Sequence, residues 1–269
     1  MEAPAKIYLT EEKETLLITL YAKAADSHLQ NSILHDTYSD ELLKQIDYDF
    51  SKFKDIGNNV IVIRAKEFDE WIKQFIKENE IITVLYLGCG LDTRINRINP
   101  PPQVNWFDLD YPEVIKLRKT FYSDSDSYHM IESSVTGFNW FAKIPSDRNT
   151  IIIAEGIFEY LEREEVKTLI NELTNYFPRG QIIFDVMNSF AIKSGKEKLK
   201  ATTGAVHKWA VDKISEVDNL HPKLKRVTDL PIFKSRYMRK LPFGVRFPLS
   251  ILSIIPAYKN MIRLLRYNF

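Results

Sequence analysis

The sequence has 269 residues, of which 45% are hydrophobic and 27% charged, and a formal net charge of +1 at pH 7. At this length the chain can form one large α/β domain or two small ones, and the near-neutral charge gives no reason to expect a nucleic-acid partner. The single cysteine, Cys89, excludes an internal disulfide and fits a reducing compartment. The N-terminal stretch lacks a signal-peptide pattern, and no apolar run approaches the about 20 residues of a membrane span. We therefore expect a cytoplasmic protein with no membrane partner.

The N-terminal part has the apolar spacing of helices. Residues 11–30 and 40–46 carry Leu, Ala and charged residues at helical spacing. Residues 64–77 place their large apolar side chains on one helical face, which we expect to pack in the core. These side chains are Phe68, Trp71, Ile72, Phe75 and Ile76.

The central part alternates between strand and helix patterns. Two segments, 112–121 and 162–177, have the pattern of helices, and Pro112 suits a first helical turn. Apolar, β-branched runs predict strands at 81–87, 104–107, 128–131, 150–154 and 181–186. This alternation from about residue 64 to 186 is typical of a doubly wound, mostly parallel α/β sheet.

The C-terminal part is less regular. Residues 191–220 have a helical pattern that is interrupted at 202–204, and residues 224–227 and 263–269 are two further strand candidates. A late hairpin of this kind adds antiparallel strands at one edge of a doubly wound sheet. We expect one domain, in which 1–60 forms a helical cap, 61–187 the cofactor-binding core, and 188–269 lid helices and edge strands.

Polar groups and glycines follow four successive strands. Gly88 and Gly90 follow the strand 81–87, and the next strand ends in Asp108 and Asp110. In an open α/β sheet, ligands bind outside the carboxyl ends of the strands, where a glycine turn allows close backbone approach and an acidic group can bind ribose hydroxyls. The later strands end at Ser133–Ser134 and at Glu155. Their common position predicts a nucleoside-type cofactor.

The glycine pattern narrows the type of cofactor. The third glycine of the dinucleotide fingerprint would fall at position 93, which is Thr93, and no Gly-rich sequence with a following lysine offers a triphosphate cradle. The sequence therefore favours a cofactor that has ribose and adenine but no pyrophosphate, such as S-adenosylmethionine.

Three segments carry a family resemblance. Residues 84–94 (VLYLGCGLDTR), 106–112 (WFDLDYP) and 154–161 (AEGIFEYL) resemble the leucine carboxyl methyltransferase superfamily. The similarity is greatest to its bacterial branch named after the tetracenomycin polyketide-synthesis O-methyltransferase, and it covers nearly the whole chain. The resemblance implies a Rossmann-like class I S-adenosylmethionine-dependent methyltransferase.

The resemblance also implies roles for the methionine-binding residues. Arg64 would bind the methionine carboxylate of the cofactor, for which a guanidinium fork is well shaped, and Lys23 would assist. Gly88 and Gly90 would let the backbone pass under the methionine and ribose. Glu155 would bind the methionine ammonium.

On the nucleoside side, Asp110 is the first candidate for the ribose hydroxyls and Asp108 the second. Ser134 and Val135 lie where the family often has Asp-Leu beside the adenine, so Ser134 would bind more weakly than an acid. Tyr86 replaces an acid that many methyltransferases carry before the glycine turn, which leaves its task to Glu155 alone.

Several of these residues also have simple structural interpretations. Arg64 alone fits a solvated charge at a helix start, and Asp108 fits a cap for the helix near Pro112. For Asp92 we favour capping of the helix after the glycine turn. Glu155 directly follows an apolar strand and therefore needs a partner. Cys89 is expected to be a small packing residue.

The acceptor side is less defined by sequence. Tyr160, His207 and Tyr21 are candidate pocket groups, of which Tyr160 would orient the acceptor and His207 would act as general base. No histidine spacing indicates a metal site. The expected reaction is methyl transfer to a carboxylate or hydroxyl of a small, polyketide-like molecule. Carboxyl methylation of a protein C-terminus and cofactor binding without turnover are the alternatives, and sequence leaves the oligomeric state open.

Overall fold

The computed structural model describes residues 5–6, 9–53 and 58–269. Part of the N-terminal stretch, for which no signal peptide is predicted, lies outside the described residues. The same holds for part of the predicted helical cap 1–60.

One large sheet runs through the described part of the chain, with strand order β5-β4-β3-β6-β7-β9-β8. The first five strands in this order pair in parallel, whereas β9 pairs antiparallel to both β7 and β8. Their bounds are β3 Ile82–Leu87, β4 Val104–Asp110, β5 Tyr128–Glu132, β6 Asn149–Ala154, β7 Gly180–Met187, β8 Lys225–Pro231 and β9 Ile262–Asn268. The predicted doubly wound sheet with an antiparallel hairpin at one edge is confirmed.

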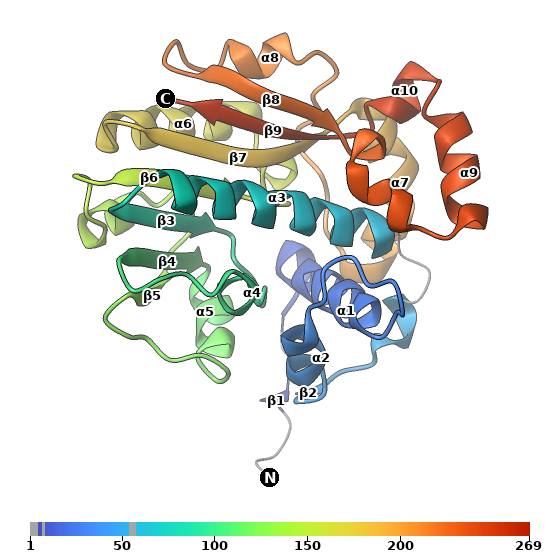
Figure 1. Cartoon of the computed structure of the whole chain (residues 1–269), viewed down its shortest axis with the longest axis horizontal. Helices are drawn as coiled ribbons and strands as arrows, with labels where there is room; N and C mark the ends of the chain where they lie inside the picture. The colour runs from blue at the N-terminus through green and yellow to red at the C-terminus, as the bar shows by residue number, and fades with distance from the viewer. Residues whose placement is uncertain (1–4, 7–8, 54–57) are drawn as a thin grey trace.

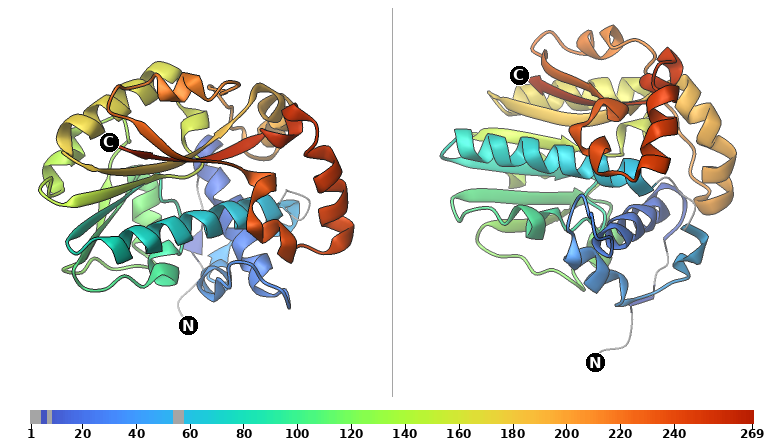
Figure 2. Two further views of the ribbon diagram at one scale, coloured as in Figure 1. Left: turned by 45° about the horizontal axis from the view of Figure 1, so that its top comes forward. Right: turned by 45° about the vertical axis from the view of Figure 1, so that its right-hand side comes forward.

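Helices cover both faces of this sheet (Figure 1; Figure 2). The strand β3 is buried along its whole length, because alternate residues enter two different cores. Leu85 and Leu87 pack in the core that contains helix α6, Arg163–Tyr176. Val84 and Tyr86 pack in the core that contains helix α3, Asn58–Glu78. The predicted apolar face of 64–77 lies in this second core, and its residues Trp71 and Phe75 are buried.

The N-terminal helices pack beside the carboxyl ends of the strands (Figure 1). They comprise η1 Glu11–Glu14, α1 Thr15–Ser27, α2 Thr37–Leu43 and η2 Phe50–Phe53. The predicted helix 40–46 extends too far, because buried Ile46 belongs to β2, Ile46–Asp47, which pairs with β1, Ala5–Lys6.

The elements that connect the parallel strands β3 to β7 are short, apart from α6. They are α4 Arg94–Ile98, α5 Pro112–Arg118, η3 Asn139–Lys143 and η4 Phe158–Tyr160. Pro112 does occupy the first turn of α5, as the sequence predicted.

The region after β7 differs most from the prediction. Helix α7, Ser189–Thr203, ends at Gly204, whose φ of +80° is left-handed and favours glycine. The predicted continuation to 220 is therefore wrong, apart from the short helix α8, Ser215–Asp218. Between β8 and β9 lie η5 Ile232–Lys234, η6 Arg236–Lys240, α9 Phe243–Leu252 and α10 Pro256–Lys259. No helix within the described ranges is long and apolar enough to span a bilayer.

The sheet order predicts unequal stability effects for two apolar truncations. Leu265 on the interior strand β9 is 0% exposed, whereas Val227 on the outer strand β8 is 43% exposed. Urea unfolding should show that Leu265→Ala lowers the free energy of unfolding by about 2–5 kcal/mol, because it leaves a cavity. Val227→Ala should cost less than about 1 kcal/mol. Equal losses would contradict the interior position of β9.

Candidate active site

A cavity of about 220 Å³ lies at the carboxyl ends of β3, β4, β5 and β6. It is bounded by residues from these strand ends and from η1, α1, η4 and the segment after α7. Among the residues predicted from sequence, its lining includes Lys23, Arg64, Gly88, Gly90, Asp110, Ser134, Val135, Glu155 and Tyr160. The strand ends, together with α1, α3 and η4, thus bring nine of the predicted positions to one cavity.

The glycine turn after β3 forms the floor of this cavity. Gly88 and Gly90 have φ values of +63° and +53°, a left-handed conformation that glycine adopts without strain. A Cβ atom at Gly88 would lie 2.3 Å from Cγ2 of Ile157. Gly88 N also donates to Leu109 O at 2.8 Å, which ties the turn to β4. The turn therefore requires glycine both for its backbone angles and for its close packing.

Asp110 lies beside this turn at the end of β4. Its Oδ2 accepts a hydrogen bond from Gly90 N and its Oδ1 one from Tyr111 N, both at 2.7 Å. Burial raises the pKa of Asp110 to about 6, although these two backbone donors favour the charged form. Each carboxylate oxygen keeps a second acceptor position, so Asp110 can accept hydrogen bonds from a ligand in the cavity.

Asp108, the second candidate for the ribose hydroxyls, does not reach the cavity. Its side chain is 0% exposed and accepts hydrogen bonds from Trp106 Nε1, Arg118 Nη2 and Tyr128 OH at 2.7, 2.5 and 2.7 Å. Since strand side chains alternate in direction, Asp108 and Asp110 face the same side of the sheet. The carboxylate of Asp108, however, is surrounded by its three hydrogen-bond donors. It is an internal carboxylate that holds Arg118 and is not among the residues that line the cavity, and the N-cap of α5 is Tyr111.

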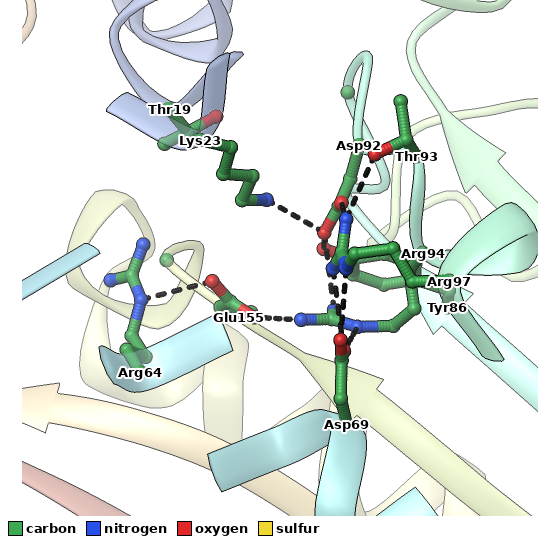
Figure 3. Close-up of polar contacts among 12 residues, drawn as sticks. Thr19, Lys23, Arg64, Asp69, Tyr86, Asp92, Thr93, Arg94, Arg97 and Glu155 are labelled. Atoms are coloured by element: carbon green, nitrogen blue, oxygen red, sulfur yellow. Dashed lines mark hydrogen bonds and ion pairs between the residues drawn. The ribbon is translucent and has the colours of Figure 1, made fainter. Parts of the chain in front are cut away.

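Arg64 lies within α3, almost fully buried, so the alternative of a solvated charge is wrong. Its Nε donates to Glu155 Oε1 at 3.1 Å (Figure 3). Its Nη1 donates to Asp185 Oδ2 at 2.7 Å. In the described part of the chain, the third nitrogen, Nη2, makes no hydrogen bond. It lies 3.2 Å from where a Cβ of Gly156 would stand, so this glycine keeps space around it. Arg64 thus retains a donor beside the cavity.

Glu155 connects Arg64 to a larger group of charges. Its Oε2 accepts from Arg94 Nη2 at 2.5 Å, which supplies the partner that the sequence required. Burial opposes ionisation of Glu155, but the guanidinium groups of Arg94 and Arg64 outweigh it and hold the pKa below its usual range. Glu155 is therefore charged at neutral pH.

Asp92 is the centre of this group and does not cap α4. The N-cap of α4 is Thr93, which makes no side-chain cap bond. Instead, Asp92 receives Lys23 Nζ at 2.9 Å, Arg97 Nη1 at 2.8 Å and Tyr86 OH at 2.9 Å (Figure 3). Burial opposes its charge, yet the neighbouring cations place the pKa of Asp92 well below its usual range. The capping interpretation is wrong, because the side chain of Asp92 forms ion pairs with Lys23 and Arg97 and caps no backbone N–H of α4.

Two further acids complete the group. Asp69 of α3 accepts from Arg94 Nε and Arg97 Nε, at 2.7 and 2.8 Å. Asp36 accepts from Arg97 Nη1 at 2.8 Å and from Thr93 Oγ1 at 2.5 Å. We call the whole set the buried ion network; it contains Lys23, Asp36, Arg64, Asp69, Asp92, Arg94, Arg97, Glu155 and Asp185.

Tyr160 and His207, the two candidates on the acceptor side, lie together. Their ring centroids are 5.1 Å apart, and burial lowers the pKa of His207. Tyr160 lines the cavity; His207 itself does not, although its neighbours Val206 and Lys208 do. The third candidate, Tyr21, packs against Phe50 and Phe53 and does not line the cavity.

Comparison with known proteins identifies the family. The family model for leucine carboxyl methyltransferases matches residues 16–174. The chain is 32% identical, over 98% of both chains, to the tetracenomycin polyketide synthesis O-methyltransferase TcmP of Streptomyces glaucescens. The chain belongs to the leucine carboxyl methyltransferase family. It is also 30% identical, over 82% of both chains, to the S-adenosyl-L-methionine-dependent methyltransferase dpfgK of Gibberella zeae.

Solved structures agree with this fold. A Thermobifida fusca protein named as a candidate methyltransferase superposes with a TM-score of 0.66 over 96% of this chain and 94% of that one. A duf574 family protein of Streptomyces avermitilis gives 0.64, over 96% and 97%. At 12% and 10% identity these likenesses concern the fold alone. Together with the relatives, the family membership makes the protein an S-adenosylmethionine-dependent methyltransferase.

The side chains of the cavity fit this cofactor of the family. S-adenosylmethionine carries two cationic groups, a sulfonium and an ammonium, and one carboxylate. The cavity of the methyltransferase offers carboxylates at Asp92, Asp110 and Glu155 and a guanidinium donor at Arg64. Ser134 and Val135 line it after the end of β5, and Ser134 Oγ lies 2.9 Å from Thr136 Oγ1.

Sequence reasoning missed several polar residues of the site. Asp185 was present in a predicted apolar strand, where a buried carboxyl group requires a partner, and this was the available signal. Arg94 stood inside the family motif without an assigned role. Glu159 gave no signal in the sequence, yet it is 4% exposed and its Oε2 lacks a hydrogen-bond partner among the described residues.

The methyltransferase should lose stability at high pH through Glu159. Burial and the nearby Asp185 raise its pKa to about 8, so the folded state holds a proton that the unfolded chain releases above about pH 4. The stability contribution of this group is therefore complete below about pH 4 and declines as the pH rises through about 8. Urea unfolding at about pH 5 and about pH 9 should show a smaller decline for Glu159→Gln than for wild type.

Glu41→Gln makes the same chemical change on the exposed surface of α2 and serves as control. It should keep the wild-type pH dependence. A Glu159→Gln protein with an unchanged decline would show that Glu159 is ionised in the folded state.

Proposed function

We propose that this methyltransferase transfers the methyl group of S-adenosylmethionine to an oxygen atom of a small, polyketide-like acceptor. The observation that carries the proposal is that one cavity is lined by the predicted cofactor residues other than Asp108, with Tyr160 beside them. Apolar side chains of Leu16, Ile157 and Val206 share this cavity. The relative TcmP, named for tetracenomycin polyketide synthesis, supports an acceptor of this class.

The proposed cofactor contacts follow from the free hydrogen-bonding positions. Arg64 would bind the methionine carboxylate through Nη2, since its other nitrogens hold Glu155 and Asp185. Glu155 would bind the ammonium with its remaining lone pairs. Asp110 would accept the ribose hydroxyls, and Ser134 with Val135 would contact the adenine.

Lys23 has a different proposed role from the one that the resemblance implied. Its Nζ is committed to Asp92 at 2.9 Å, and its side chain is 2% exposed. Burial lowers its pKa, which the carboxylates of Asp92 and Glu155 partly offset. Lys23 would therefore assist by fixing Asp92 and adding positive potential near the carboxylate site.

The chemistry requires alignment more than activation. When bound, S-adenosylmethionine supplies an activated methyl group on its sulfonium sulfur. The protein must hold the acceptor oxygen in line and exclude water. A carboxylate acceptor is ionised at neutral pH and requires no base, whereas a hydroxyl acceptor must lose its proton.

We place the acceptor beside Tyr160 and His207. The segment after α7 is fixed over η4, because Lys208 N and Trp209 N both donate to Glu159 O, at 2.7 and 3.4 Å. This segment would cover the acceptor. Burial favours the neutral imidazole of His207, which is the form that can accept a proton from a hydroxyl.

The cofactor contacts can be tested by calorimetric titration with S-adenosylhomocysteine, the demethylated product. Arg64→Lys keeps the buried charge but loses the fork, and Asp110→Asn loses the acceptor for two hydroxyls. Each should weaken binding at least about tenfold, the effect of one hydrogen bond to a charged group. Arg163→Lys, on the exposed start of α6, is the matched control and should bind as wild type does. Wild-type affinity in folded Arg64→Lys or Asp110→Asn protein would refute the respective contact.

The acceptor class can be tested with a radiolabelled methyl group. Wild-type protein should label aromatic carboxylates or phenols and leave peptide C-termini unlabelled. With a phenolic acceptor, His207→Asn should lower kcat by about 100-fold or more, since the general base is lost. With a carboxylate acceptor it should change kcat less than about tenfold. Transfer to peptides alone would refute the small-molecule acceptor, and equal effects on both acceptors would refute the role of His207.

A further inference from the structure

The connection 232–261 between β8 and β9 is long for two neighbouring antiparallel strands. Hairpin connections usually have about 2–5 residues, and loops beyond about 12–15 residues are commonly functional. This connection contains η5, η6, α9 and α10, of which α9 stands at the outer edge of the molecule (Figure 1; Figure 2). None of its residues lines the cavity.

The connection is firmly attached to the body at both ends. Ser235 Oγ donates to Glu67 Oε1 of α3 at 2.6 Å, and Asn188 Nδ2 donates to Ala257 O at 2.9 Å. The rings of Phe190 and Tyr258 also pack, with centroids 4.8 Å apart. Helix α9 is therefore presented on a fixed support.

Helix α9 turns apolar side chains to the outside. It contains no buried residue, and Phe243 and Phe247 are 67% and 53% exposed. Ile251 and Ile254 continue this surface with 51% and 78% exposure. Phe243, Phe247 and Ile251 are spaced four residues apart and therefore lie on one face of α9, and Ile254 follows in the turn two residues after the end of the helix. We call these four residues the α9 patch.

The sequence that carries the patch is basic. From Leu230 to Phe269 the sequence has eight Lys or Arg residues and no Asp or Glu, although the whole chain has a net charge of only +1. Arg246 on α9 lies over the ring of Phe243, 6.0 Å from its centroid. The exposed basic residues nearby in the connection are Lys234, Arg236, Arg239, Lys240 and Lys259.

We propose that the α9 patch binds the surface of a bilayer that contains anionic phospholipids. Amphipathic helices with Phe and aliphatic residues on one face and Lys or Arg beside them lie in the headgroup region of such bilayers. The phosphate groups attract the basic residues, and the apolar side chains enter the acyl boundary. This peripheral contact needs no spanning helix. It departs from the sequence-based expectation of no membrane partner, which considered spans alone.

Charge argues against the other occupants of the patch. A two-fold dimer through α9 would bring the same basic surface of two copies together, with unfavourable repulsion. Anionic lipid attracts both the Lys and the Arg residues of this surface. The anionic bilayer complements both the apolar and the basic part of the surface.

The test is co-sedimentation of the full chain with vesicles. Vesicles of phosphatidylcholine mixed with phosphatidylglycerol should bind the protein, and vesicles of phosphatidylcholine alone should bind it much more weakly. The combined variant Phe243→Ser, Phe247→Ser and Ile254→Ser should lose at least about tenfold in affinity. Replacing Lys234, Arg239 and Lys259 by Gln should lower the affinity for anionic vesicles about fivefold for each charge removed.

The matched control is Leu29→Ser with Ile81→Ser, which removes apolar side chains that are 56% and 59% exposed away from α9. It should bind vesicles as wild type does. The proposal is overturned by absence of binding to anionic vesicles, equal binding to both vesicle types, or equal losses in control and patch variants. The proposal is also overturned if sedimentation equilibrium shows that the wild-type protein is a dimer and the patch variant a monomer. Because the patch lies outside the cavity, cofactor binding by all variants should stay unchanged, so this test is independent of the proposed acceptor.

Discussion

The arrangement of the cofactor site depends on mutual neutralisation of buried charges. Removing a charged side chain from water costs several kcal/mol, and only close, well-formed ion pairs offset that cost. The buried ion network contains four cationic side chains and five carboxyl groups, from segments far apart in the sequence. It joins α1 through Lys23, α3 through Arg64, and the end of β6 through Glu155. Moving any of these elements would leave charges unpaired, so the network fixes the walls of the cavity relative to its floor.

This dependence explains why the family motifs extend beyond the glycine turn. Gly88 and Gly90 form the turn through their left-handed backbone angles, whereas the residues after them attach this turn to neighbouring elements. Thr93 occupies the place of the missing third glycine and donates to Asp36, while Arg94 reaches Asp69 and Glu155. In this chain, Thr93 thus forms a polar bond to the N-cap of α2 where the dinucleotide fingerprint has close helix–strand packing, and Arg94 bonds to α3 and to the end of β6.

The sequence predicted those features that depend on local pattern. The β-branched runs located the parallel strands, and the common position of strand ends located Asp110 and Glu155 in one cavity. Features that depend on distant partners were missed. Asp92 offered a plausible local cap in sequence, but its actual partners include Lys23, which lies on another helix. Asp108 was the second candidate for the ribose hydroxyls after Asp110, but it is buried and accepts a hydrogen bond from Arg118, a partner that the sequence pattern did not indicate. Helix α9 was missed because Pro248 lies inside it and its apolar face has no core to meet.

The position of β9 has a consequence for biosynthesis. This strand lies between β7 and β8 but follows both in the sequence. While the polypeptide is being made, β7 therefore remains an open sheet edge after its parallel neighbours are complete, and unpaired edges favour association between chains. The pairing of β7 with β9 also closes a long stretch of sequence, which is slow because of its entropy. We expect the nascent protein to depend on protection of this edge until β9 has emerged from the ribosome.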